Sequence, residues 1–192
     1  MQKNYSFTKI KKLEGSPNVL QMFLGKISRI TNRFIKNNSS KVVNTMKNFS
    51  RIKNDVWETP DTVFLDACTW SEIVPKLDVC TNGLNSKCEF YFTEEDNGLE
   101  QNWFADSWMN CPYSNASKWI DKAYEENQKN NINVLALLNV TTDTRSWHNC
   151  ILNKRNVEIY FIKGRLRFIK DGHMSEQPSQ HPSCYVLWRK RN

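Results

Sequence analysis

From Trp57 onward, short apolar segments alternate with amphipathic ones, and this alternation restricts the fold more than any other feature. The apolar segments have the length of β-strands, and the amphipathic segments repeat apolar residues every three or four positions, as helices do. Such a chain builds a mostly parallel sheet covered by helices, because parallel strands require crossover connections. The chain ends in strands without intervening helices, which predicts an antiparallel edge. The predicted fold class is an open α/β sheet.

The individual elements follow from the same patterns. Thr59 is predicted as the N-cap of the first helix, with Pro60 in its first turn. The predicted helices span residues 59–74, 116–127 and 146–152. The predicted strands span residues 76–79, 88–92, 107–109, 133–140, 157–162, 166–169 and 183–188. The Pro/Gly/Asn-containing stretches between them are expected to be loops.

Positive charge is concentrated at the N-terminus. Residues 1–54 hold twelve Lys/Arg and one acid, whereas residues 55–192 hold fifteen Lys/Arg and nineteen acids. We therefore predict two parts, a partly disordered basic extension (1–54) and a folded domain (55–192). A basic extension favours polyanions through counterion release, but it is equally typical of a solvated tail.

Apolar residues at helical spacing between residues 17 and 37 predict an amphipathic helix in the extension, with basic residues beside its polar face. This helix could dock on the domain, bind phosphates or lie on an acidic membrane surface. Its length and charge are less than stable membrane anchoring needs, so no membrane association is expected. Nucleic-acid binding is expected through Lys26, Arg29 and Arg33.

Cysteine usage and hydropathy exclude other classes of protein. The six cysteines form no C-x-x-C pair and no Cys/His ligand spacing, which favours reduced thiols in the cytoplasm and no metal site. No apolar run approaches the ~20 residues that cross a bilayer. The sequence does not indicate an oligomeric state.

Polar clusters follow three of the predicted strands, at the sheet edge where α/β proteins bind ligands. Each cluster alone is also typical of an ordinary turn. The three clusters are Asp78-Val79-Cys80 with Asn82-Gly83, Asp96-Asn97-Gly98-Leu99, and Asn110-Cys111-Pro112-Tyr113-Ser114.

The third cluster has residues suited to a flat, conjugated amino group. The lone pair of such a group is delocalised into the ring, so an enzyme must hold both amino hydrogens with acceptors at fixed positions. Asn110 would supply an amide oxygen and Cys111 a backbone carbonyl, while Pro112 stiffens the turn and Tyr113 stacks on the extruded base. Without context, an ordinary turn that enters a helix is the more usual interpretation of the same residues.

The wider context favours the first interpretation. The supporting motifs are, in chain order, Trp57-Glu58-Thr59-Pro60, Leu77-Asp78-Val79-Cys80, Asn85-x-Lys87-Cys88, Asp96-Asn97-Gly98-Leu99, Asn110-x-Pro112-Tyr113-Ser114, Thr141-Thr142-Asp143-Thr144 with Trp147-His148, and Ile162-x-Gly164-Arg165-Leu166-x-Phe168. In this order and spacing, they resemble the phage-type DNA N-6-adenine methyltransferase family over about residues 57–188.

The resemblance implies a Rossmann-like methyltransferase sheet, S-adenosylmethionine as methyl donor, double-stranded DNA as substrate and no metal. It implies that residues 110–113 form the catalytic loop. It also implies that six residues line the cofactor site: Thr59, Pro60, Asp78, Val79, Cys80 and Asp96. The family motif reads Asn-Pro-Pro-Tyr, whereas this chain has Cys111 at the second position. The chemistry uses the carbonyl of that residue rather than its ring, so we expect a less rigid loop that remains active.

Two further features have alternative interpretations. His148 could act as a general base, although packing support beside Trp147 is the more usual role. Lys163, Arg165 and Arg167 alternate along the predicted strand 166–169 and its approach, so they would face one side. They could bind phosphate, with Arg165 the candidate, or protect a solvated edge strand.

Each competing function explains some of the same sequence features. Related Asn-x-x-Tyr loops serve cytosine N4, RNA adenine and protein glutamine, which are also conjugated amino groups. A catalytically inactive DNA-binding protein would retain the basic extension without binding the cofactor. A membrane-surface protein would depend on the amphipathic helix alone.

Overall fold

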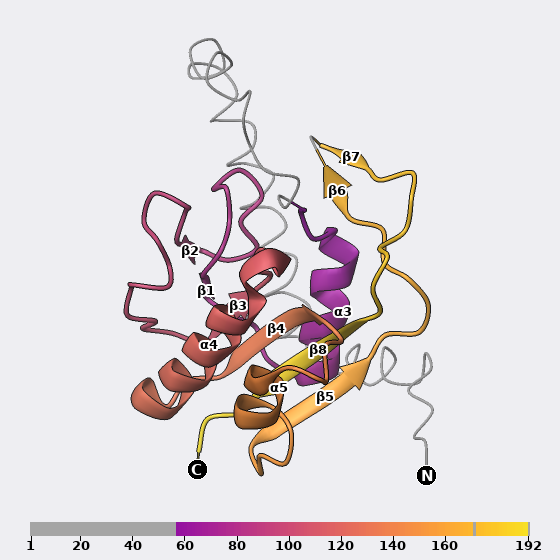
Figure 1. Ribbon diagram of the computed structural model, residues 1–192. Helices are drawn as coiled ribbons and strands as arrows, with labels where there is room; N and C mark the ends of the chain where they lie inside the picture. The colour runs from indigo at the N-terminus through magenta and orange to yellow at the C-terminus, as the bar shows by residue number, and fades with distance from the viewer. Residues whose placement is uncertain (1–56, 171, 192) are drawn as a thin grey trace, which may run out of the picture. The chain divides into compact units, whose positions relative to one another are not determined.

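The structure is a computed structural model that describes residues 57–170 and 172–191. The predicted basic extension, with Lys26, Arg29 and Arg33, lies outside the described residues. Within them, the main sheet has six strands (Figure 1). Their order across the sheet is β2 (Phe90–Tyr91), β1 (Leu77–Asp78), β3 (Ser107–Met109), β4 (Val134–Asn139), β8 (Ser183–Trp188) and β5 (Val157–Phe161).

Strand pairing confirms a mostly parallel sheet with antiparallel pairing from the C-terminal segment. β2, β1, β3 and β4 run parallel to one another. β8 pairs antiparallel with β4 on one side and with β5 on the other, so it lies one strand in from the edge. The hydrophobic runs of β4 and β8 explain this central position, because strands covered on both faces carry apolar residues throughout.

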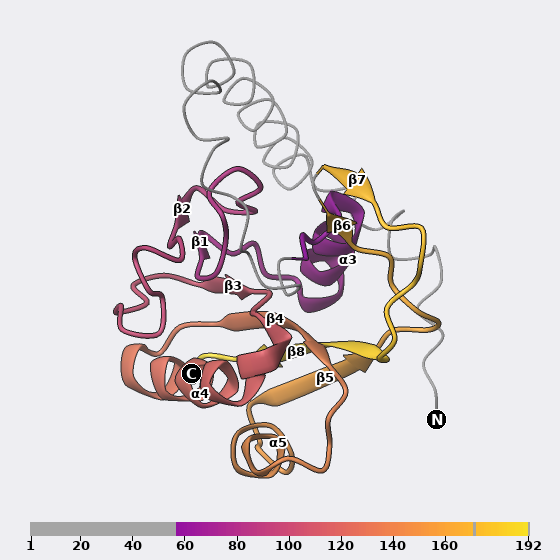
Figure 2. The ribbon, with the colours of Figure 1, turned by 45° about the horizontal axis from the view of Figure 1, so that its top comes forward.

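Helices cover both faces of the sheet. Figure 2 shows α3 (Asp61–Ser71) on one face, and α4 (Ala116–Asn130) with α5 (Arg145–Cys150) on the other. The buried residues of α4 include Trp119, Ile120 and Ala123, at the spacing of one helical face. Each long helix ends where a residue takes a left-handed conformation, Glu72 after α3 and Asn131 after α4.

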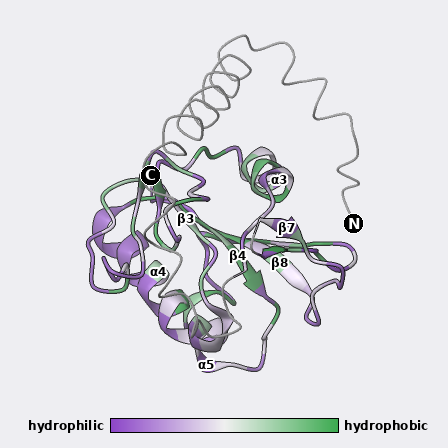
Figure 3. Ribbon diagram, turned by 90° about the horizontal axis from the view of Figure 1, so that it is seen from above, coloured by the Kyte–Doolittle hydropathy of each residue, from purple (hydrophilic) through white to green (hydrophobic). Residues whose placement is uncertain are grey.

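The core lies between these layers. Every residue of β8 is buried, as are the first five of β4. Figure 3 shows the contrast between hydrophobic β4 and the largely hydrophilic surface of α4. Five of the seven tryptophans are buried in this core: Trp103, Trp108, Trp119, Trp147 and Trp188.

A small hairpin stands apart from the main sheet, formed by β6 (Ile169–Lys170) and β7 (His173–Met174). The predicted strand 166–169 is therefore wrong. Gly164, with φ +87°, turns the chain after β5. The backbone of residues 166–168 then bonds to residues 175–179, with Ser175 N–H donating to Phe168 O and Ser179 N–H to Leu166 O.

The start of α3 also differs from the prediction. Pro60 occupies the N-cap position with an extended backbone, and no side chain caps the helix. Val63 N–H and Phe64 N–H both donate to Pro60 O. Thr59 precedes the cap, and its buried hydroxyl has no hydrogen-bond partner. The N-cap prediction for Thr59 is therefore wrong, because ψ 143° at Pro60 keeps that residue outside the helix.

Candidate functional site

The carboxyl ends of four parallel strands meet at one edge of the sheet. Asp78 closes β1, Asn110 directly follows β3, and Asn139 closes β4. Open α/β sheets bind ligands at this edge. The three polar clusters singled out in the sequence therefore lie on the same edge.

The Asn110 side chain is oriented by the chain itself. Its Nδ2 donates to the carbonyl oxygen of Trp57 at 3.1 Å. This bond fixes which end of the amide faces the backbone, so Oδ1 is the end left to accept further hydrogen bonds. The Tyr113 hydroxyl lies 3.4 Å from that oxygen, at the long limit of a hydrogen bond.

The loop after Asn110 is short and restricted. Cys111 is buried, and because it precedes proline it is confined to extended backbone conformations. Pro112 has φ −56° and ψ 121°, and it caps a single 3₁₀ turn, η1 (Tyr113–Asn115), which runs into α4. The Tyr113 ring is therefore held between a rigid proline and a helix start.

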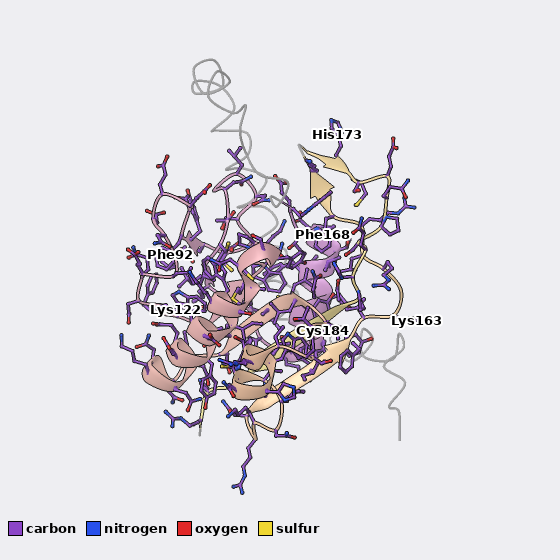
Figure 4. The ribbon with its side chains drawn as sticks, viewed as in Figure 1. Phe92, Lys122, Lys163, Phe168, His173 and Cys184 are labelled. Carbon is purple, nitrogen blue, oxygen red and sulfur yellow. The ribbon has the colours of Figure 1, made fainter. Side chains whose placement is uncertain are left out.

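An aromatic cluster adjoins this loop. The Phe168 ring lies edge-on to Tyr113 at 6.1 Å between centroids, and 6.4 Å from the Trp57 ring. Phe168 is buried, and Figure 4 shows it between the hairpin and the top of α3. The ammonium of Lys170 lies 5.4 Å from the Trp57 ring centroid, within cation–π range. Residues far apart in sequence thus form one aromatic wall.

This wall borders a cavity of about 530 Å³. That volume is within the range of small-molecule sites, which run from roughly 300 to 1,000 Å³. Most of its lining comes from the segment between β7 and β8. The lining residues are Trp57, Tyr113, Asn139, Phe168, Ser175, Gln177, Pro178, Ser179, Gln180 and His181.

Asn139 brings an unpaired acceptor to the same cavity. Its Oδ1 is buried and has no hydrogen-bond partner. Ser183, its cross-strand neighbour on β8, has a buried hydroxyl in the same condition. An unsatisfied buried polar atom costs about 1–3 kcal/mol, so this end of β4 and β8 is polar at the expense of stability.

Asp78 organises the loop that follows β1. It is 2% exposed, and its two carboxylate oxygens accept backbone N–H bonds from Cys80 and Lys87 at 3.3 and 2.9 Å. Burial raises the pKa of Asp78 to about 7, against the lowering effect of these hydrogen bonds and of the Lys87 charge. The Lys87 ammonium itself pairs with Asp61 at 2.5 Å. Asp78 therefore closes residues 80–87 into a fixed loop.

Within this loop, side chains bond to nearby backbone. Asn82 Oδ1 accepts from Leu84 N–H, and Asn82 Nδ2 donates to the Glu58 carboxylate at 3.2 Å. Gly83 has φ +80°, a left-handed conformation that suits glycine. Burial, with the neighbouring Cys111 and Asp78, raises the pKa of the Cys80 thiol. Cys80 is therefore a neutral thiol in this setting.

The Asp96 cluster forms a turn after β2. Asp96 Oδ2 accepts from both the backbone and the hydroxyl of Thr93 at 2.8 Å, which lowers the pKa of this exposed carboxyl. Gly98 packs against β1, because an added Cβ would lie 2.3 Å from the carbonyl oxygen of Val79. The Asp96 turn is thereby held beside the Asp78 loop.

Comparison with known proteins decides the family. A model of the DNA N-6-adenine-methyltransferase (Dam) family matches residues 30–192. The chain is 31% identical over 150 residues to a DNA N-6-adenine-methyltransferase of Haemophilus phage HP1, covering 77% of this chain and 86% of that protein. The chain belongs to the DNA N-6-adenine-methyltransferase family. The resemblance inferred from the motifs is confirmed.

A second relative matches a shorter region. The chain is 44% identical over 50 residues to a protein of Escherichia coli (strain K12) named "Putative methyltransferase YfdM". The match covers 26% of this chain and about half of that protein, 53%.

The structure brings the N-terminal motif of the Dam family next to the other motifs. Trp57 accepts from Asn110, and the Glu58 carboxylate accepts from Asn82. The Glu58 backbone also forms an antiparallel bridge with Ile169, through two hydrogen bonds of 2.9 Å. Two consecutive residues therefore contact the loop after β1, the loop after β3 and the hairpin.

Two other predicted residues, His148 and Arg165, are not among those that line the cavity. His148 is exposed on α5 and does not line the cavity. Arg165 is exposed in the irregular segment before β6. Among the described residues, no group of His, Cys, Asp or Glu could hold a metal ion, and no helix is long and apolar enough to cross a membrane.

The sequence did not single out Asn139 or the loop 175–181 as site residues. Asn139 had a usable signal, since it is the polar residue that ends a buried parallel strand. The loop had none, because its position over the cavity depends on the long-range hydrogen bonds to residues 166 and 168.

Proposed function

We propose that this chain transfers a methyl group from S-adenosylmethionine to N6 of an adenine in double-stranded DNA, with the base extruded into the cavity beside Tyr113. The observation that carries the proposal is the oriented Asn110 amide. Its Nδ2 is bound to Trp57 O, so its Oδ1 is presented as an acceptor next to a cavity walled by aromatic rings. An adenine amino group and ring require these two features.

The loop residues have separate roles in this reaction. Asn110 Oδ1 accepts one N6 hydrogen and the Cys111 carbonyl accepts the other, which directs the nitrogen lone pair away from both. Pro112 holds these acceptors in place, and Tyr113 stacks on the base. The weak 3.4 Å contact between Tyr113 and Asn110 Oδ1 is one that the incoming amino group can replace.

The cofactor is proposed to bind at the adjoining loops, in the position that Rossmann-like sheets use. Candidate residues are Thr59, Pro60, Asp78, Val79, Cys80 and Asp96, which lie on or beside the loops after β1 and β2 or at the start of α3. These residues fit a polar group of this kind, since the buried Thr59 hydroxyl has no hydrogen-bond partner and Asn82 of the loop after β1 bonds to Glu58, next to the Trp57 that accepts from Asn110. S-adenosylmethionine supplies an electrophilic methyl group on a sulfonium.

No protein base is needed for the transfer. N6 forms a bond to the methyl carbon as the sulfur–carbon bond breaks, and the extra N6 proton then passes to water. His148 lies outside the cavity lining, so the site does not use it as a general base.

The proposal is tested by incubating the full chain with methyl-labelled S-adenosylmethionine and unmethylated duplex DNA, then digesting the DNA to nucleosides. We expect label in N6-methyladenine. Asn110→Ala should lower the rate by roughly 10²–10³-fold, the usual effect of removing one preorganised hydrogen bond from the transition state. Asn149→Ala, on the exposed surface of α5, is the matched control and should retain full activity.

Other results would revise specific parts of the proposal. Label in cytosine would change the acceptor, and label only in RNA or protein would change the substrate class. Binding of the cofactor without transfer to any of these would refute catalysis by this loop. Equal activity of Asn110→Ala and Asn149→Ala would refute the role of Asn110.

A further inference from the structure

The segment 163–181, between β5 and β8, differs in charge from the rest of the folded domain. It holds four Lys/Arg and two acids, together with two histidines. The remaining residues of the domain, 55–162 and 182–192, hold eleven Lys/Arg and seventeen acids. A local basic segment in an acidic domain attracts a polyanion to one place on its surface.

All four cations of this segment are exposed: Lys163, Arg165, Arg167 and Lys170. Within the part of the chain that the structure describes, none of them forms an ion pair with a carboxylate. Figure 4 shows Lys163 at the periphery of the molecule, and His173 projecting from the hairpin. Their charges are therefore available to a partner.

The structure removes the main alternative role for these cations. Charges on an edge strand prevent strands of other molecules from pairing with it. The edge strand β5 ends at Phe161, before the first of the four, and Lys163, Arg165 and Arg167 lie on no strand. Edge protection therefore does not explain them.

The same segment forms most of the cavity. Phe168 and the residues from 175 to 181 supply seven of its ten lining residues. Phe168 is buried against Tyr113, whereas Arg167 directly before it and Lys170 two residues after it are exposed. Residues 163–181 thus contain both most of the cavity lining and the four exposed cations.

The covalent structure of DNA relates the cavity to the cations near it. An extruded base remains attached to its sugar, and that sugar to two phosphates, so a base inside the cavity places its own phosphates at the rim. Arg167 and Lys170 lie within two residues of the lining residue Phe168, and cations near such a rim neutralise phosphates without reading sequence. The hairpin β6–β7 is narrow enough for the major groove, which admits a two-stranded ribbon.

From these observations, we propose that residues 163–181 are the element that docks the folded domain on duplex DNA around the target base, with Lys163, Arg165, Arg167 and Lys170 on the flanking phosphates. This proposal rests on the proposed function, because it takes the cavity as the place of the extruded base. In this proposal, one continuous segment both binds the DNA phosphates and forms much of the wall of the cavity that takes the base.

The test compares two full-length variants of equal charge. The first carries K163Q, R165Q, R167Q and K170Q. The second carries K129Q, R155Q, K190Q and R191Q, which are four exposed cations at the opposite edge of the sheet, near the start of β4 and β5 and the end of β8. Binding to a fluorescent 30-base-pair duplex is measured by anisotropy across a range of salt concentrations, without methyl donor.

We expect the first variant to bind at least roughly tenfold more weakly at low salt, and its slope of log affinity against log salt to fall by about two to four. The control should keep the slope of the unmodified protein. Because Lys170 also contacts the Trp57 ring, a triple variant that retains Lys170 shows whether lost packing contributes, and thermal unfolding shows whether each variant is folded.

The outcomes separate this proposal from the proposed function. Equal slopes for the two quadruple variants, in a protein that still methylates adenine in duplex DNA, would overturn the docking element alone. A protein that binds and methylates no DNA would overturn the proposed function itself. A first variant weakened for single-stranded RNA but not for duplex DNA would also overturn the choice of partner.

Discussion

Two regions flank the proposed catalytic loop, residues 110–113, and they differ in charge and in how their polar groups are used. Residues 79–102, after β1 and β2, hold five acids and one lysine. Their side chains bond within the chain, as Asn82 and Asp96 show. Residues 163–181 are basic, and their cations have no ion-pair partner among the described residues. The difference is the one expected if the two proposed substrates, which have opposite charges, bind on different sides of Asn110.

S-adenosylmethionine, the proposed methyl donor, carries a sulfonium, an ammonium and a carboxylate and is positive overall, whereas DNA carries one negative phosphate charge per nucleotide. An acidic region attracts the first and repels the second, while a basic region does the reverse. In the proposed function, charge would therefore keep the backbone of the nucleic acid away from the loops assigned to the cofactor, although both substrates meet at residues 110–113.

The largest expected effect concerns Asp78, which is buried on the acidic side. Its pKa of about 7 lies above the unfolded value of about 3.9, so between these values the folded protein holds a proton that the unfolded chain has released. Its contribution to stability therefore falls as pH rises through this window. The amide of the Asp78→Asn variant does not titrate, so the stability of the unmodified protein relative to this variant should fall between pH 4 and pH 8, by up to about 4 kcal/mol.

Urea unfolding of both proteins at pH 4 and pH 8 measures this difference. Arg165→Gln, on the basic side, is the control, because the charge of an exposed arginine does not change in this range. A stability difference for Asp78→Asn that stays constant across pH would show that the carboxylate is charged throughout.

A smaller effect is expected from neutralising the acidic side. The variant E89Q, E94Q, E95Q and E100Q removes four exposed carboxylates and leaves Asp96 to hold its turn. DNA should bind roughly threefold more tightly at low salt, and the methyl donor roughly threefold more weakly, since exposed charges are screened over about 10 Å. Calorimetric titration with each substrate checks the opposite signs, and changes of the same sign would contradict the comparison.

The smallest expected effect concerns the loop between the two regions. Cys111→Pro should raise the methyl-transfer rate by about two- to fivefold, because proline removes about 0.4–1 kcal/mol of conformational freedom where the backbone already suits it. Cys111 precedes Pro112 and is confined to extended conformations, which proline also adopts. Single-turnover rates measure the change. Cys111→Ala, which lacks the ring, should show no increase.

Elements of the fold that depend on nearby residues could be predicted from the sequence, whereas those that depend on contacts between residues far apart in the chain could not. β3 and β8 match their predicted bounds, because apolar content alone defines a buried strand. α4 is also confirmed, three residues longer than predicted. The hairpin β6–β7 was not predicted, since its position depends on the bridge from Ile169 to Glu58, more than a hundred residues away.

The candidate site divides in the same way. The loop 110–113 was recognisable because its chemistry lies in consecutive residues. Asp78 was predicted from its position at a strand end. Its hydrogen bond from Lys87 N–H was not predictable, because it forms only when the loop after β1 folds back toward Asp78. Asn139 and the loop 175–181 join the cavity only through folding, and no local pattern identifies them.

The contacts of Trp57 and Glu58 have a consequence for the order of events. These two residues bond to the loop after β1, to Asn110 and to Ile169 of the hairpin, so a displacement at any one is transmitted to the others. We therefore expect the two substrates to bind cooperatively. Thermodynamic linkage then requires reciprocity: whatever factor the donor applies to the affinity for DNA, DNA applies to the affinity for the donor.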